Sequence, residues 1–223
     1  MKVDWKRNLL ISWIGCFFTG ASFSLVMPFI PIYIEELGAP KNQIELFSGL
    51  AISVTAFAAA IVAPIWGNLA DQKGRRLMMI RASIGMTVTM GSLAFVPNVY
   101  WLLIMRFFTG VLSGYVPNAT ALIASQAPRE KSGSALGTLA TGAIAGNLIG
   151  PSMGGALAET FGIKNVFIIT GIVLFITSLL TIFLVKEDFV PVEKQEMLTM
   201  KQLFEKMTNS QVLIGLFITS LIL

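Results

Sequence analysis

The chain has 223 residues, of which 55% are hydrophobic and 13% charged, with a mean hydropathy of +0.76 and a formal net charge of +4. These values lie outside the range of soluble domains and indicate several membrane spans. Histidine is absent and Cys16 is the single cysteine, which excludes an intrachain disulfide and any histidine-based catalytic or metal site. The basic residues lie at the ends of apolar segments, as in membrane proteins, so nucleic acid is not an expected partner.

The N-terminal part of the chain predicts two membrane-spanning helices. Residues 8–34 carry no charge, and this run is longer than the apolar region of a signal peptide. Pro28 and Pro31 are expected to loosen the far end of this first helix, because proline removes a backbone donor. The second span lies between Glu45 and Asp71.

The central part of the chain predicts two further spans. Residues 82–128 form a stretch of 47 residues in which Arg106 is the only charge. A single crossing needs about 20 residues, so this stretch is too long for one helix. The turn at Pro97 divides it, which predicts a third span near 77–96 and a fourth near 99–123.

The fifth span, within residues 132–158, contains a ridge of glycines at every fourth position: Gly142, Gly146, Gly150 and Gly154. On a helix this spacing places them on one side, where a neighbouring backbone can approach closely. Pro151 is expected to bend the helix, because its ring crowds the carbonyl of Asn147. Only a membrane helix tolerates so many glycines together with a proline. Residues 165–185 predict a sixth span.

The distribution of basic residues predicts the topology. Of the 16 Lys and Arg residues, 13 lie in the N-terminus and the second, fourth and sixth connections, and two lie in the first, third and fifth. This bias predicts a cytoplasmic N-terminus. We expect a six-helix domain at 1–185 and a cytoplasmic linker at 186–211, whose apolar spacing fits an amphipathic helix on the inner membrane surface or a solvated linker helix. Residues 212–223 are too short to cross, which predicts a seventh span that the chain only begins.

The loop between the second and third spans reads Gly-Asn-Leu-Ala-Asp-Gln-Lys-Gly-Arg-Arg over 67–76. Gly67 is expected to let two helices meet, Gly74 to permit a sharp turn, and Asp71 to form a breakable charge network with nearby cations. The alternative is a plain basic loop. The loop resembles the G-x-L-A-D-R-x-G-R-K signature of the major facilitator superfamily. The matching positions are Gly67, Leu69, Ala70, Asp71, Gly74 and Arg75, and Arg76 is a conservative replacement.

A second resemblance to this superfamily lies in the fourth span, where Arg106 is followed four residues later by Gly110. An arginine inside a span costs about 2.5–3.5 kcal/mol on insertion scales, so it normally faces a cavity or a partner. The alternative is that Arg106 lies near the outer interface and reaches water with its side chain. The resemblance implies that Arg106 takes part in proton coupling and in the response to substrate.

The glycine ridge carries a third resemblance, to the motif of the superfamily's antiporters. The matching residues are Gly146, Gly150, Pro151, Gly154 and Gly155. We expect this motif to act by packing, as a tight seam with a bend on which alternating access turns. The same segment also fits the hydrolase pattern G-x-S-x-G, but that pattern needs a strand–turn–helix setting and a histidine. An enzyme with a catalytic residue is therefore not expected.

Within the superfamily, the chain resembles the first half of the twelve-span drug:proton antiporters, and in particular the multidrug efflux pumps of Gram-positive bacteria. The resemblance implies an all-α membrane fold in which six helices form two three-helix repeats. It also implies a multi-pass plasma-membrane transporter that exports amphipathic, often cationic drugs in exchange for protons, without a metal or other cofactor. The alternatives are an inactive truncated fragment of such a pump and an antiporter for another small metabolite.

The substrate cavity is expected to face the C-terminal half of the transporter. Candidate lining residues, chosen as aromatic, soft or amide side chains near mid-span, are Phe23, Met27, Phe57, Asn118 and Asn147. Apolar packing explains the first three almost as well. No Asp or Glu lies deep in any of the six spans, although a proton antiporter needs a titratable group. We therefore expect the proton-binding carboxylate in the C-terminal half.

Overall fold

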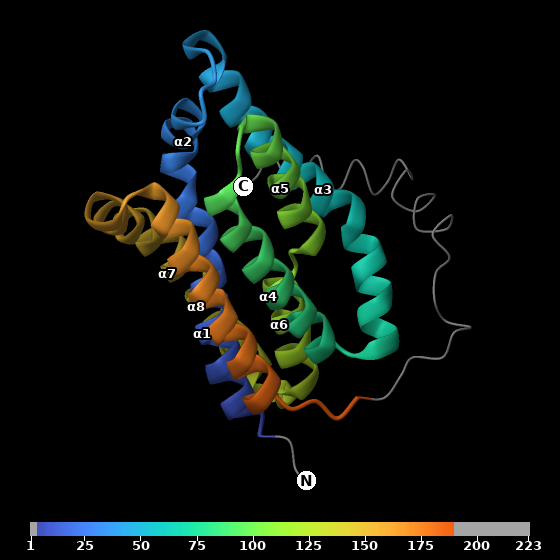
Figure 1. Ribbon diagram of the computed structural model, residues 1–223. Helices are drawn as coiled ribbons and strands as arrows, with labels where there is room; N and C mark the ends of the chain where they lie inside the picture. The colour runs from blue at the N-terminus through green and yellow to red at the C-terminus, as the bar shows by residue number, and fades with distance from the viewer. Residues whose placement is uncertain (1–3, 190–223) are drawn as a thin grey trace, which may run out of the picture.

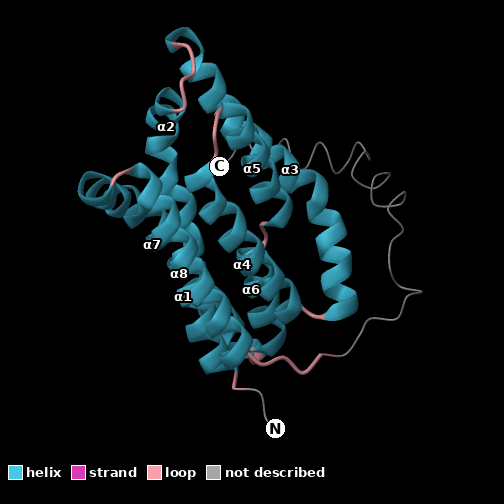
Figure 2. Cartoon of the chain, viewed as in Figure 1, coloured by secondary structure: helices cyan, strands magenta, loops and turns pink. Residues whose placement is uncertain are grey.

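Six helical crossings make up residues 4–189, the part of the chain that the structure, a computed structural model, describes. They are α1 (Trp5–Val26) with α2 (Ile30–Glu36), α3 (Ile44–Lys73), α4 (Arg75–Ser92), α5 (Val99–Leu112) with α6 (Tyr115–Gln126), α7 (Arg129–Phe161) and α8 (Ile163–Leu184). Figure 2 shows these helices joined by short loops, with no strand in the described range. The predicted all-α fold class is confirmed. The predicted linker helix and seventh span lie outside the described residues.

Five of the crossings are long and apolar enough to span a membrane by length and composition. They are Trp5–Glu36, Lys41–Lys73, Arg75–Phe95, Val99–Gln126 and Ile163–Leu184. The remaining crossing, α7, has 33 residues and is long enough, but its many small and hydroxyl residues lower its hydropathy. It packs along α1 in the most extensive helix–helix contact of the described residues, so it belongs to the same bundle.

The crossings alternate in direction between two ends of the bundle. Figure 1 shows the start of α1, the α3–α4 turn, the end of α6 and the end of α8 at one end, and the α2–α3, α4–α5 and α7–α8 turns towards the other. We call the end that contains the start of α1 and the α3–α4 turn the basic end. Most of the described cations belong to it: Lys6, Arg7, Lys73, Arg75, Arg76, Arg129, Lys131 and Lys186.

A buried asparagine ties three segments together at the basic end. Asn8 on α1 has 0% of its surface exposed. Its Nδ2 donates to Oε1 of Gln126 (2.7 Å) and to the carbonyl of Lys186 (2.6 Å), and its Oδ1 accepts from the backbone N–H of Lys186 (3.1 Å). A buried amide must satisfy its polar atoms within the protein, so these bonds fix the start of α1 against the ends of α6 and α8.

Prolines and glycines account for the interruptions of the helices. The loosening predicted near Pro28 and Pro31 is confirmed, because a 3₁₀ turn at Met27–Phe29 separates α1 from α2. The fourth span, predicted as one helix, is instead broken at Ser113–Gly114, which Figure 2 shows as a loop between α5 and α6. Gly114 has a φ of +117°, a conformation that glycine adopts readily. By contrast, α7 continues through Pro151, and the bend there stays a prediction.

Candidate transport site

The glycine ridge of α7 lies against the backbone of α1. A β-carbon added to Gly142, Gly150 or Gly154 would lie 2.7 Å, 2.9 Å and 2.7 Å from the carbonyl oxygens of Trp13, Ala21 and Leu25, respectively, and one on Gly146 would meet the carbonyl of Phe17. Contacts below 3.0 Å are essentially never made by a real β-carbon. Only glycine therefore permits this approach, and we call the contact the α1–α7 seam.

Two side-chain hydrogen bonds cross the α1–α7 seam. Ser24 Oγ donates to the carbonyl of Asn147 at 2.6 Å, and Trp13 Nε1 donates to Thr141 Oγ1 at 3.0 Å. The first bond matters because Pro151, four residues after Asn147, has no N–H to donate to that carbonyl. Gly155 lies outside the seam, since a β-carbon there would meet nothing within 4 Å. The expectation that Gly155 shares in the close packing is therefore wrong for the described residues.

A cavity of about 560 Å³ opens beside the α1–α7 seam. Its lining comprises Thr19, Gly20 and Phe23 of α1, Ala59, Val62, Ala63, Trp66 and Gly67 of α3, Arg75 of α4, residues 113–118 of the fourth crossing, and Ala143 and Asn147 of α7. Of the five candidates from the sequence, Phe23, Asn118 and Asn147 meet in this cavity. Met27 and Phe57 do not line it and are 39% and 66% exposed.

The cavity combines apolar walls with a few polar groups, which is the usual character of a small-molecule site. Asn118 and Asn147 contribute amides and Thr19 a hydroxyl, while Arg75 is the one charged residue of the lining. Among residues 4–189, no carboxylate lines the cavity, and no group of three or more His, Cys, Asp and Glu side chains is able to hold a metal. Trp66 also lines the cavity but was not among the candidates from the sequence, although its place directly before Gly67 is a signal that could have indicated it.

The loop at 67–76 forms a turn held by charge. Arg75 Nη2 of α4 donates to Oδ1 of Asp71 at the end of α3, and this is an ion pair. Gly74 permits the turn, as predicted, with a φ of +96°. Gly67 differs from the expectation that it lets two helices meet. A β-carbon there would meet nothing within 4 Å, so no described helix lies against it. The residue lines the cavity instead. Leu69 is half-buried on the last turns of α3.

Glu187, which follows α8, joins this loop to the end of the bundle. Its Oε1 accepts from the backbone N–H of Arg75 (2.9 Å) and its Oε2 from that of Arg76 (2.8 Å). A carboxylate at the first N–H groups of α4 satisfies orphan donors and opposes the positive end of the helix dipole. Arg76 Nη2 also donates to the carbonyl of Ile182 on α8 (2.6 Å). Glu187 lies far from 67–76 in the sequence, so no local pattern indicated it.

Arg106 is buried between α5 and α3, and only 1% of its surface is exposed. Its Nε donates to the carbonyl of Ala51 at 3.5 Å, and its own carbonyl accepts from Thr55 Oγ1 at 3.0 Å. Gly110 lies against the backbone of Thr55, so α3 and α5 approach closely there. The alternative that Arg106 reaches water is wrong, and Arg106 does not line the cavity either. Its Nη1 has no hydrogen-bond partner among the described residues.

These features define a class of protein. A bundle of membrane-crossing helices with a cavity beside a close helix seam, and a charged turn at one end, is the architecture of a multi-pass membrane transporter. A family model of the Major Facilitator Superfamily matches residues 12–223. The chain belongs to the Major Facilitator Superfamily.

Curated relatives match the chain over nearly its whole length. It is 60% identical over 221 residues to the multi-drug resistance efflux pump PmrA homolog of Lactococcus lactis, covering 99% of this chain and 55% of that protein. It is 55% identical to the multi-drug resistance efflux pump PmrA of Streptococcus pneumoniae, covering 100% of this chain and 56% of that protein. The multidrug resistance protein MdtG of a Rahnella species is 48% identical, covering 99% and 54%, respectively.

A solved structure shares the fold. The human organic anion transporter MFSD10 (TETRAN) superimposes with a TM-score of 0.71 at 18% sequence identity, covering 83% of this chain and 49% of that one. At this identity the likeness concerns the fold alone. The chain spans about half the length of the curated relatives it matches.

The α1–α7 seam predicts different outcomes for alanine substitution of Gly146, inside the seam, and of Gly155, outside it. Gly146→Ala forces the backbones of α1 and α7 apart, and overpacking of this kind lowers the free energy of unfolding by about 1–3 kcal/mol. Gly155→Ala adds a methyl group in open space and a better helix former, so it leaves stability unchanged or raises it by up to about 1 kcal/mol. The unfolding midpoint of the purified chain is followed by the reaction of a thiol-specific dye with Cys16, which is fully buried. Equal midpoints for the two variants would contradict the seam.

The carboxylate of Glu187 predicts a local stabilisation of the α3–α4 turn. Glu187→Ala removes two hydrogen bonds from backbone N–H groups to a charged acceptor, and the free energy of unfolding falls by about 1.5–3 kcal/mol. Asp188→Ala is the matched control, because Asp188 is exposed and accepts no hydrogen bond in the described part of the chain; a change within about 0.5 kcal/mol is expected. Amide hydrogen exchange at Arg75 and Arg76 is the direct measurement, and equal protection in both variants would refute the contact.

Proposed function

We propose that the chain forms the N-terminal half of a multidrug efflux antiporter that exports amphipathic compounds in exchange for protons. The main support for this proposal is the cavity of about 560 Å³, because its apolar walls and two amides suit amphipathic molecules of varied shape. The relatives support this proposal, because two of them are named multi-drug resistance efflux pumps and the third a multidrug resistance protein, and each matches at least 99% of this chain. The proton gradient supplies the energy, and no cofactor or catalytic residue takes part.

The proposed topology places the basic end in the cytoplasm. The 13 Lys and Arg residues of the N-terminus and the even connections support it, because cytoplasmic loops of membrane proteins are enriched in these residues. The ion pair between Asp71 and Arg75 then lies at the cytoplasmic side of the cavity, which Arg75 also lines. Breaking and re-forming this pair is the proposed gate: when the cavity opens to the cytoplasm, the two side chains separate.

The α1–α7 seam has a mechanical part in this proposal. Both helices contribute cavity residues, Thr19 and Phe23 from α1 and Asn147 from α7. Because the two backbones touch along four glycines and share the bond from Ser24 to Asn147, α1 and α7 move as one unit. Alternating access in such folds is largely a rocking of one bundle against another. The second bundle is proposed to be the C-terminal half. Arg106, buried between α5 and α3, is proposed to take part in proton coupling and in the response to substrate.

A cell-based efflux assay tests the proposal. Cells that lack their own pumps express this chain alone, the second half of the L. lactis relative alone, or both together, and are loaded with a cationic amphipathic dye. The pair retains several-fold less dye than either half, and a protonophore abolishes the difference. Efflux by this chain alone would contradict the need for a second half, whereas two folded, membrane-inserted halves without efflux would contradict the transport function. Thiol protection of Cys16 reports the folding of this chain, alone and in the pair, and protease resistance of the membrane-inserted second half reports the folding of that half.

The proton site is proposed to lie in the second half, because every acidic residue among residues 4–189 lies at or beyond a helix end. The membrane-embedded carboxylates of the second half are neutralised one at a time. In at least one of these variants, dye export is expected to lose its dependence on the pH gradient. Glu45→Gln and Glu159→Gln in this chain are the matched controls and leave it unchanged. Export driven by the pH gradient after all of those carboxylates are neutralised would exclude this placement.

A further inference from the structure

The break in the fourth crossing leaves backbone carbonyls without helical donors. Ser113 is the C-cap of α5 and has an extended backbone (ψ of −179°), so no N–H of α6 is in helical register with its carbonyl. The turn at Gly114 also keeps the N–H of Tyr115 from Val111, because α6 starts only at Tyr115. Inside a bilayer no water replaces the missing donors, and each unsatisfied carbonyl is costly.

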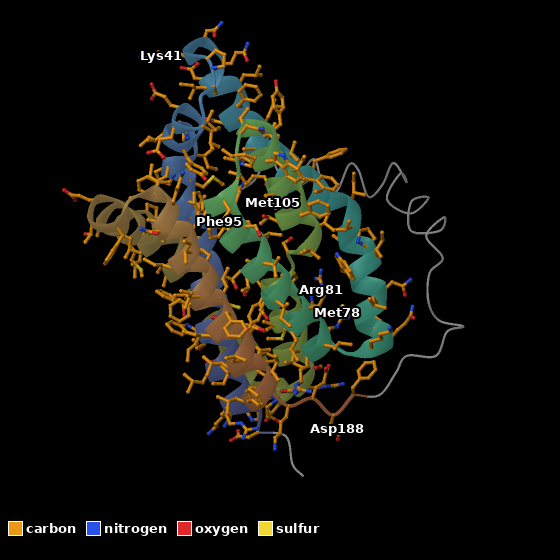
Figure 3. All side chains as sticks on the ribbon, in the orientation of Figure 1. Lys41, Met78, Arg81, Phe95, Met105 and Asp188 are labelled. Carbon is orange, nitrogen blue, oxygen red and sulfur yellow. The ribbon has the colours of Figure 1, made fainter. Side chains whose placement is uncertain are left out.

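Two side chains from other helices supply these donors. Trp66 Nε1 of α3 donates to the carbonyl of Val111 at 2.7 Å, and Arg81 Nη2 of α4 donates to the carbonyl of Ser113 at 2.8 Å. The two donors also contact each other, because Cζ of Arg81 lies 3.8 Å from the centroid of the Trp66 ring. Arg81 thus places a positive charge at the C-terminal end of α5, the negative end of its dipole. Figure 3 shows Arg81 between α4 and α3.

This capped break forms part of the cavity wall. Trp66, Ser113 and Gly114 line the cavity, and so does Asn118, the amide of α6 one turn further on. Arg81 lies behind this wall: its Nη2 is 3.4 Å from the place where a β-carbon on Gly114 would stand. The direction of α6, and with it the position of Asn118 in the cavity, therefore depends on how the last carbonyls of α5 are held.

We propose that Trp66 and Arg81 form a positioning pair that caps α5 at its break and fixes the α6 wall of the substrate cavity. Arg81 acts through Ser113 and Trp66 and does not itself contact the substrate. The inference about transport rests on the proposed efflux function, whereas the capping itself is a property of the isolated chain. The competing account is that Arg81 serves as a counter-ion, either for an anionic substrate or for a carboxylate of the second half.

The first measurement needs no transport activity. Amide hydrogen exchange of residues 111–118 is recorded for the full chain in lipid nanodiscs. Arg81→Met is expected to raise the exchange rate about tenfold, since it removes a charged donor from a backbone carbonyl. Trp66→Phe, which keeps a ring for stacking but loses the N–H, raises it less. Exchange at the α1–α7 seam stays unchanged. Trp101→Phe and Arg129→Met are the matched controls, because both residues are exposed.

Arg81→Gln separates the capping role from a counter-ion role. It keeps an N–H donor for the Ser113 carbonyl but removes the positive charge, so it is expected to raise the exchange rate of residues 111–118 less than threefold. In the paired efflux assay, Arg81→Met raises the KM for the dye several-fold with kcat nearly unchanged, whereas Arg81→Gln leaves the KM close to that of the native pair. An Arg81→Gln variant as impaired as Arg81→Met, in either assay, would overturn the proposal in favour of a counter-ion. If the native pair exports no dye, the exchange measurements still decide the capping.

Discussion

The close approach of α1 and α7 is the contact on which the arrangement of the site depends. Four glycines in register remove every side chain that would keep the two backbones apart, and the carbonyls of α1 fill the space. In a bilayer, where lipid is as apolar as leucine, such packing replaces the hydrophobic effect as the force between helices. The cavity lies directly beside this contact, so the seam sets the distance between its α1 and α7 walls.

A second constraint of the bilayer explains three side-chain bonds that otherwise look unrelated. At three carbonyls that a proline or a break leaves without a helical donor, a neighbouring helix supplies one: Ser24 bonds the Asn147 carbonyl, Trp66 bonds Val111, and Arg81 bonds Ser113. These bonds let helices that line the cavity deviate from regular geometry without leaving an unsatisfied carbonyl in lipid. Irregular backbone and the cavity therefore occur together in the described residues, because both need protected polar groups.

The sequence was sufficient to predict features whose signal is periodic or local. Span order, the glycine ridge, the turn at Gly74 and the burial of Arg106 follow from hydropathy, fourfold spacing or residue type. It was insufficient to predict contacts whose partner is distant in the chain, or features that depend on how a helix is oriented in the bundle. Glu187 caps α4 from more than a hundred residues away. Gly67 lies against no neighbouring described helix, although it was expected to let two helices meet, and Met27 and Phe57 do not line the cavity. The break at Gly114 was accessible in principle, since Gly114 and Pro117 together predict it.

We propose that α1 and α7 move as one unit throughout the transport cycle of the proposed antiporter. The most direct measurement is the distance distribution between spin labels at Leu10→Cys on α1 and Leu148→Cys on α7, positions that are 58% and 77% exposed. It is recorded in the assembled pair of halves at low and high pH, with and without drug. A distribution that stays the same under all four conditions is predicted. A shift or a second population that follows pH or drug would contradict the account, because the seam would then open during transport.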